Sequence, residues 1–207
     1  GWDGPANVAC LYIGIFLDDA EMVNDAIAYY KTGKGGGCIT EGIVFGGQPV
    51  EMGRDQPHAA IGIDAYADLC QALWNQGLDM YAYEDNLLLK GFEYYARFNL
   101  EHPVDWTPID YHGHKFYYPA PSNNAPSSMP NNRILANEAV YHHYVDRKGL
   151  DAPYLRAMMK LKNVEVLTGM MYTYSDTTTA YVSFPVPPIP EDVKVTGSIG
   201  RIDLDWA

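Results

Sequence analysis

The chain has 207 residues, of which 47% are hydrophobic, so it can bury the core of one domain or one and a half. Its formal net charge is -12, and no segment carries the dense lysine and arginine that phosphate contacts require, so we expect no nucleic acid as partner. No stretch of about 18 uninterrupted apolar residues occurs, so we expect no membrane-spanning helix and no membrane partner.

The cysteines indicate neither a metal site nor a disulfide framework. Cys10, Cys38 and Cys70 are odd in number and far apart, and they form no Cys-x-x-Cys pair. We interpret them as buried small hydrophobic residues, and we expect no metal ion or other cofactor.

A helical hairpin is predicted at the start of the chain. Apolar residues recur at helical spacing in 6–17 and in 20–33, where Asp18 or Asp19 can cap the second helix and Gly33 ends it. The opening reads as a helix already under way inside a domain, so we expect a truncated or processed chain. The glycines of 33–37 lack the preceding strand and the following Gly-Lys of a phosphate-binding loop, and we expect an ordinary loop there.

A second hairpin is predicted from the helical periodicity of 58–77 and 79–100. Residues 101–130 are rich in proline and aromatic residues without periodicity, which predicts a long irregular loop with a functional role. A third helix is expected over 131–149, and a shorter one over 152–162.

The character of the chain changes near its end. The proline-rich segment 185–191 is typical of a stiff linker, and 192–207 alternates apolar and polar residues around a glycine-containing turn, as two strands do. Two strands cannot stand alone, and this pattern resembles the opening of a fibronectin type III module. We therefore expect one domain over 1–184, a linker, and the first strands of a truncated β-sandwich.

Repeated antiparallel helical hairpins with loops at one end are typical of α/α barrels and toroids. The sequence holds about three hairpins, fewer than a closed toroid needs. The expected fold class is therefore mainly α: an incomplete (α/α) toroid with a short C-terminal β segment.

Several stretches together resemble the alginate lyase superfamily of polysaccharide lyases. They cover about two thirds of the chain in the family's order, and they read GIFLDDAEMVNDAIAYY, GRDQPHAAIGIDAYADLCQALWNQGLDMYAYEDNLLLKGFEYYARFNL, VYHHYVDRKGLDAPY and GMMYTYSD. The resemblance implies a C-terminal portion of an (α/α)-toroid domain that cleaves an acidic, uronate-containing polysaccharide by β-elimination. It also implies a secreted or periplasmic protein, and a further N-terminal part of the domain as the partner of this portion.

β-Elimination sets the residue types of the expected site. The proton at C5 of a uronate becomes acidic only when the neighbouring carboxylate is neutralised, which calls for arginine, asparagine, glutamine or histidine there and for a tyrosine or histidine as base or acid. In the segment RDQPH, Arg54 and Gln56 can hold the carboxylate, His58 can move the proton, and Asp55 can orient either neighbour. A structural interpretation is also open, in which Asp55 and Gln56 cap the helix and Arg54 pairs with Glu51.

The second acid or base is open to several residues. Tyr141 and Tyr144 share a helix face beside His142, and we expect a chemical role for one of these tyrosines and substrate contact for the histidine, although a tyrosine stripe at helical spacing also fits a core. Three residues of the aromatic loop are expected to contact substrate: His112, His114 and Tyr117. The His-x-His spacing lacks a third ligand, so it is a weak metal signal.

Two other classes of function stay open. A glycoside hydrolase of the α/α-toroid type would need two carboxylates, which Glu51, Asp55 or Asp85 could supply. A noncatalytic carbohydrate-binding scaffold is the other alternative, since the chain is expected to be incomplete.

Overall fold

The computed structural model describes residues 2–111, 116–122 and 137–161. The fold is mainly α, as predicted. The long helices are α1 (Asp3–Leu17), α2 (Ala20–Thr32), α4 (Gln56–Asn75), α5 (Tyr83–Asn99) and α7 (Pro153–Leu161). The predicted linker and β segment, 185–207, lie outside the described residues.

The first hairpin forms as expected. The side chain of Asp19 accepts a hydrogen bond from the backbone N–H of Met22 at 3.0 Å, so Asp19 is the cap, and Gly33 follows the last turn of α2. A Cβ added at Gly14 would lie 3.0 Å from Val23, and the absent side chain therefore allows α1 and α2 to approach closely.

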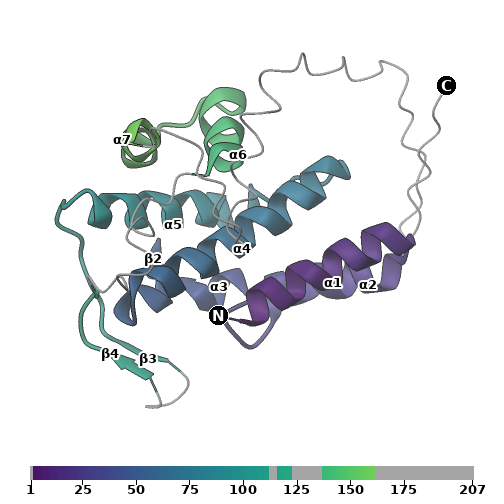
Figure 1. Cartoon of the computed structure of the whole chain (residues 1–207), viewed down its shortest axis with the longest axis horizontal. Helices are drawn as coiled ribbons and strands as arrows, with labels where there is room; N and C mark the ends of the chain where they lie inside the picture. Colours follow the sequence, from purple (N-terminus) through teal and green to yellow (C-terminus); the bar gives the residue numbers. More distant parts are fainter. Residues whose placement is uncertain (1, 112–115, 123–136, 162–207) are drawn as a thin grey trace.

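Helix α4 is the centre of the structure (Figure 1). It contacts α1 on one side and α5 on another, and α5 in turn packs on α7. Ile63, Leu69 and Leu73 are fully buried between these layers, and burial of each such side chain stabilises the fold by roughly 1.5–3 kcal/mol. The two hairpins therefore share one hydrophobic core rather than forming separate units.

Several short elements between α2 and α4 were not predicted. They are α3 (Ile39–Gly42), the antiparallel strands β1 (Ile43–Val44) and β2 (Gln48–Pro49), and the 3-10 helix η1 (Val50–Gly53). They lead the chain directly into α4, so they set the position of the residues before it.

The expected loop over 101–130 is partly regular. It contains the antiparallel strands β3 (Ile109–Tyr111) and β4 (Phe116–Tyr118), with Ile109 opposite Tyr118. The prediction of a wholly irregular loop was wrong because a pair of three-residue strands is too short to show a period.

The third predicted helix is shorter and changes type in its described part. Asn137 caps α6 (Glu138–Tyr141), which continues as the π-helix η2 (His142–Arg147). Helix α5 begins later than predicted, and three of its first residues, Glu84, Asp85 and Asn86, have left-handed backbone angles. Cys38 and Cys70 are buried as expected, whereas Cys10 is exposed on α1.

In the part of the chain that the structure describes, no helix is long and apolar enough to cross a membrane.

Candidate functional site

The N-terminus of α4 holds the residues of the segment RDQPH. Asp55 is the N-cap: its backbone is extended, and its Oδ1 accepts the backbone N–H of His58 at 2.8 Å. Pro57, the second residue of the helix, needs no hydrogen-bond donor at that position. These local preferences place Arg54, Asp55 and His58 together on one end of the helix.

Asp55 also holds the ring of His58. The Nδ1 atom of His58 lies 2.6 Å from Asp55 Oδ1 and 2.8 Å from Oδ2. An ionised carboxylate can only accept hydrogen bonds, so Nδ1 carries the proton and Nε2 keeps its lone pair in the neutral ring. Among the described residues, Nε2 has no hydrogen-bond partner, and 26% of the side chain is exposed. This arrangement is that of an oriented general base.

Arg54 lies beside this pair with its hydrogen-bonding capacity largely unused. Its Nη1 is 3.8 Å from Glu51 Oε2, and its Nε is 3.8 Å from Asp55 Oδ2, both longer than a hydrogen bond. With 40% of its side chain exposed, the guanidinium can turn toward an anion from solvent. The structure thus contains the expected ion pair with Glu51 and also leaves the arginine available for a carboxylate.

Gln56 has a different environment from the one that we expected. It is fully buried, its Nε2 donates to the carbonyl of Ser122 at 2.6 Å, and its Oε1 accepts from Asn99 Nδ2 at 2.8 Å. Both ends of the amide are used inside the protein, which favours a structural role over contact with a substrate carboxylate.

The β3–β4 hairpin is anchored beside α4 at both ends. Gln48 donates to the carbonyl of Thr107 at 2.8 Å and accepts its N–H at 2.9 Å, and Ser122 donates its N–H to Met52 O at 2.8 Å. Together with the bond from Gln56 to Ser122, these contacts place the aromatic segment next to η1 and the start of α4.

Two aromatic residues of this segment lie directly on Gly53, the residue before Arg54. A Cβ at Gly53 would be 2.2 Å from Tyr118 Cβ and 3.0 Å from Trp106, so only glycine allows this approach. Trp106 donates its indole N–H to the carbonyl of Tyr118 at 3.1 Å. Burial raises the pKa of Tyr118, and the carboxylates of Glu51 and Asp55 raise it further.

Tyr118 is therefore a site residue whose neighbours the sequence did not reveal. In the sequence it is only one tyrosine among several in an aromatic loop. Its proximity to Arg54 could not be predicted, because it depends on a contact between residues more than 60 positions apart in the chain. Tyr117, its neighbour on β4, is 58% exposed, as a residue that contacts a ligand can be. His112 and His114 lie outside the described residues.

The aromatic residues of α6 and η2 occupy another part of the molecule. Tyr144 is fully buried, its hydroxyl donates to the carbonyl of Tyr81 at 2.6 Å, and burial raises its pKa well above the usual value. His142 pairs with Asp146, and its ring meets that of Tyr141 edge-on. No hydrogen bond or ion pair of the described residues joins these side chains to Arg54 or His58.

In the described part of the chain, no group of three or more histidine, cysteine, aspartate or glutamate residues could hold a metal ion. Comparison of the chain with protein families, with curated proteins and with solved structures finds no match.

Proposed function

We propose that the chain is the C-terminal part of an (α/α)-toroid polysaccharide lyase, secreted or periplasmic, that cleaves a uronate-containing polymer by β-elimination. The observation that carries the proposal is the pair of Asp55 and His58, in which Asp55 contacts Nδ1 and Nε2 has no hydrogen-bond partner among the described residues, beside a partly exposed arginine. A base and a carboxylate-binding cation at one helix terminus are the two groups that this elimination needs first.

The proposed reaction assigns one step to each residue. Arg54 binds the uronate carboxylate and lowers the electron density at C5, and His58 Nε2 removes the C5 proton. The electrons of the C5–H bond form the C4–C5 double bond, and the C4–O4 bond breaks with its electron pair on O4. O4 then takes a proton, for which Tyr118, packed on Gly53, is our candidate among the described residues, since its phenol is protonated at neutral pH.

Asp55 is a positioning residue in this scheme. It holds Nδ1–H and so favours the tautomer whose lone pair is on Nε2. Gln56 acts only through the protein, since its amide is used by Asn99 and Ser122. Tyr141, Tyr144 and His142 are not assigned a step, because their contacts lie with other parts of the structure.

The test is incubation of the chain with alginate, glucuronan and related polymers. A lyase produces a 4,5-unsaturated uronate, whose ultraviolet absorption increases with time. New reducing ends without that absorption would favour a glycoside hydrolase, and binding without cleavage would favour a carbohydrate-binding scaffold. Either result would refute the proposed reaction.

Matched variants then test the site. His58→Ala and Arg54→Ala should each lower cleavage by at least about 100-fold, the usual contribution of a positioned base. The controls are His102→Ala and Arg156→Ala, which change exposed residues of the same types elsewhere, His102 after the end of α5 and Arg156 on α7. Full activity in both site variants would exclude this site even if the chain proved to be a lyase.

A further inference from the structure

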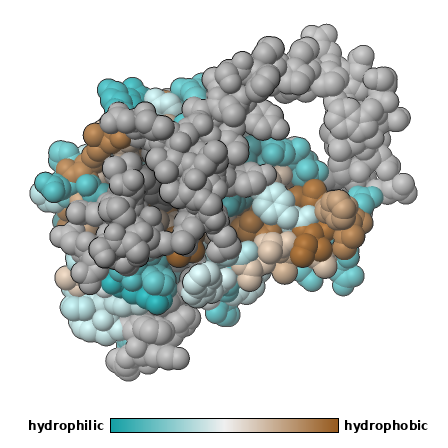
Figure 2. Space-filling model, in the orientation of Figure 1, coloured by the Kyte–Doolittle hydropathy of each residue, from teal (hydrophilic) through white to brown (hydrophobic). Residues whose placement is uncertain are grey.

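Helix α1 is apolar on both of its faces. From Gly4 to Leu17 it contains no charged residue, and Val8 and Leu11 pack into the core. The opposite face carries a row of exposed apolar residues that we call the outer stripe: Trp2, Ala6, Ala9, Ile13 and Phe16. Their exposure is substantial, with 87% for Phe16 and 64% for Trp2. Figure 2 shows hydrophobic residues gathered where Figure 1 places α1.

The spacing of the outer stripe indicates what kind of element would cover it. Its members follow one another at intervals of four, three, four and three residues. This is the seam that packs against another helix, and the small side chains of Ala6 and Ala9 allow the two backbones to approach. A helix that is apolar all round is normally enclosed by other elements, and a contiguous exposed apolar row marks an interaction surface.

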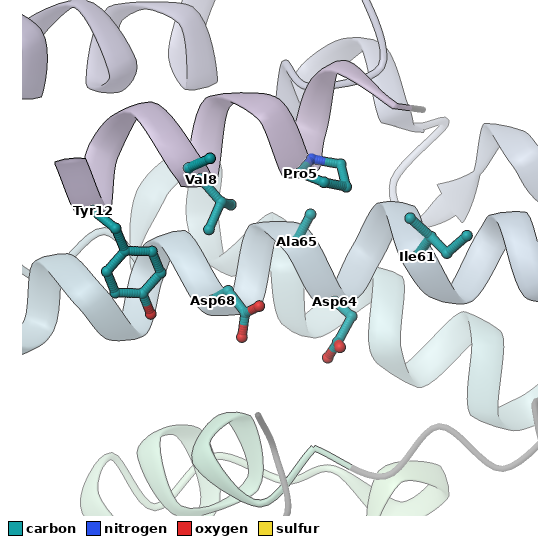
Figure 3. Close-up of a pocket in the computed structure, with 8 residues that line it drawn as sticks. Pro5, Val8, Tyr12, Ile61, Asp64, Ala65 and Asp68 are labelled. Carbon is teal, nitrogen blue, oxygen red and sulfur yellow. The ribbon is translucent and has the colours of Figure 1, made fainter. Parts of the chain in front are cut away.

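A hollow next to the outer stripe is lined by two carboxyl groups. It lies between α1 and α4, has a volume of about 250 Å³, and is lined by Pro5, Val8, Ala9, Tyr12, Ile61, Asp64, Ala65 and Asp68. Figure 3 shows Asp64 and Asp68 leaving α4 on the same side. Ala9 belongs both to the hollow and to the outer stripe, so the two features are continuous.

Among the described residues, no cationic side chain lines this hollow. Asp68 has no hydrogen bond or ion pair with any described residue, and burial together with the neighbouring charge of Asp64 raises its pKa to about 8. A lysine or arginine entering from outside would offset the cost of ionising Asp68, because an opposite charge favours the ionised carboxylate.

We propose that the outer stripe and the adjoining hollow form a docking surface for an amphipathic helix of a second, different polypeptide, which inserts a lysine or arginine side chain beside Asp68. The spacing of the outer stripe favours a helix as the partner, and the carboxyl groups of the hollow favour a cationic side chain within the apolar face of that helix. A second copy of this chain does not fit, because its own α1 has no lysine or arginine to insert and each copy has a net charge of -12.

The experiment uses two synthetic helical peptides with leucine seams. One has a single central lysine in the seam, and the other has norleucine at that position; binding to the whole chain is measured by fluorescence anisotropy. Binding of the lysine peptide should be about ten-fold tighter. Asp68→Asn should remove this preference, whereas Asp25→Asn, which makes the same substitution at an exposed site on α2, should keep it.

Variants of the outer stripe distinguish this docking from nonspecific attraction of a cationic peptide to an acidic protein, because nonspecific binding would become tighter when negative charge is added. Ile13→Asp and Phe16→Asp should each weaken binding by about ten-fold or more, although they add negative charge, because they interrupt the apolar seam. Circular dichroism checks that both variants are folded. The proposal would be overturned if neither peptide bound, if both bound equally, or if either stripe variant bound more tightly. It would also be overturned if Asp68→Asn and Asp25→Asn had equal effects, or if sedimentation showed that two copies of the chain associate through the outer stripe.

Discussion

Replacement of Asp55 by asparagine separates the two roles of this residue. Asp55 caps α4 through the backbone N–H of His58 and also holds His58 Nδ1, with contacts of 2.6 and 2.8 Å. Asparagine caps a helix about as well as aspartate, so the free energy of unfolding should change by less than about 0.5 kcal/mol. The ring, in contrast, loses an ionised acceptor.

In the proposed reaction, activity should decrease because His58 Nδ1 loses its charged hydrogen-bond acceptor. A hydrogen bond to a charged group contributes about 1.5–3 kcal/mol, which corresponds to roughly a 10- to 150-fold decrease in kcat/KM. If the asparagine amide donates to Nδ1, the proton moves to Nε2 and the base is lost, and the decrease then approaches about 10⁴-fold. The assay is the ultraviolet absorption of the unsaturated product, with urea denaturation as the measure of stability.

Asp19→Asn is the matched control, because Asp19 caps α2 through Met22 without a histidine partner. It should leave both activity and stability close to those of the unchanged protein. Unchanged kcat/KM in Asp55→Asn, or an equal loss in Asp19→Asn, would refute the assignment of Asp55 as the residue that orients the base.

Three further predictions concern the surroundings of the site and the core. Gln56→Leu should lower the free energy of unfolding by about 1–3 kcal/mol in urea denaturation, because it removes two hydrogen bonds to partly buried partners; an unchanged midpoint would contradict this. Gly53→Ala should loosen the aromatic segment, since its Cβ would lie 2.2 Å from Tyr118, and hydrogen exchange of 105–122 should accelerate. Burial lowers the pKa of His143 to about 4, so the folded state resists protonation and stability should fall as pH decreases from about 6.5 to 4. His143→Phe should reduce that dependence in urea titrations at several pH values, and an equal dependence in both proteins would refute it.

The long helices could be predicted because their periodicity is local. α1, α2 and α4 each repeat apolar positions over three or more turns, and the cap Asp19 stands directly before its helix. Short elements such as β1 and η1 have too few residues to show a period, so they were missed. The change from α6 to a π-helix also has no signal in hydrophobic spacing.

The site was predictable in one part and not in another. The contact of Asp55 with His58 spans three residues, and a helix cap brings such residues together by itself. The contacts of Gln56 with Asn99 and Ser122 span 43 and 66 residues and depend on how the helices and the aromatic segment pack. For the same reason Tyr118 did not emerge as a neighbour of Arg54 from the sequence.

The anchoring of the β3–β4 hairpin has a consequence for how this protein can vary. Gln48 and Gln56 attach the segment at its base through backbone atoms of Thr107 and Ser122, so these hydrogen bonds do not depend on which side chains the hairpin exposes. Substitutions at positions such as Tyr117 can therefore accumulate without displacing His58. In the proposed reaction, the exposed side chains of the hairpin can thus evolve independently of His58, whereas Tyr118 on the same hairpin cannot.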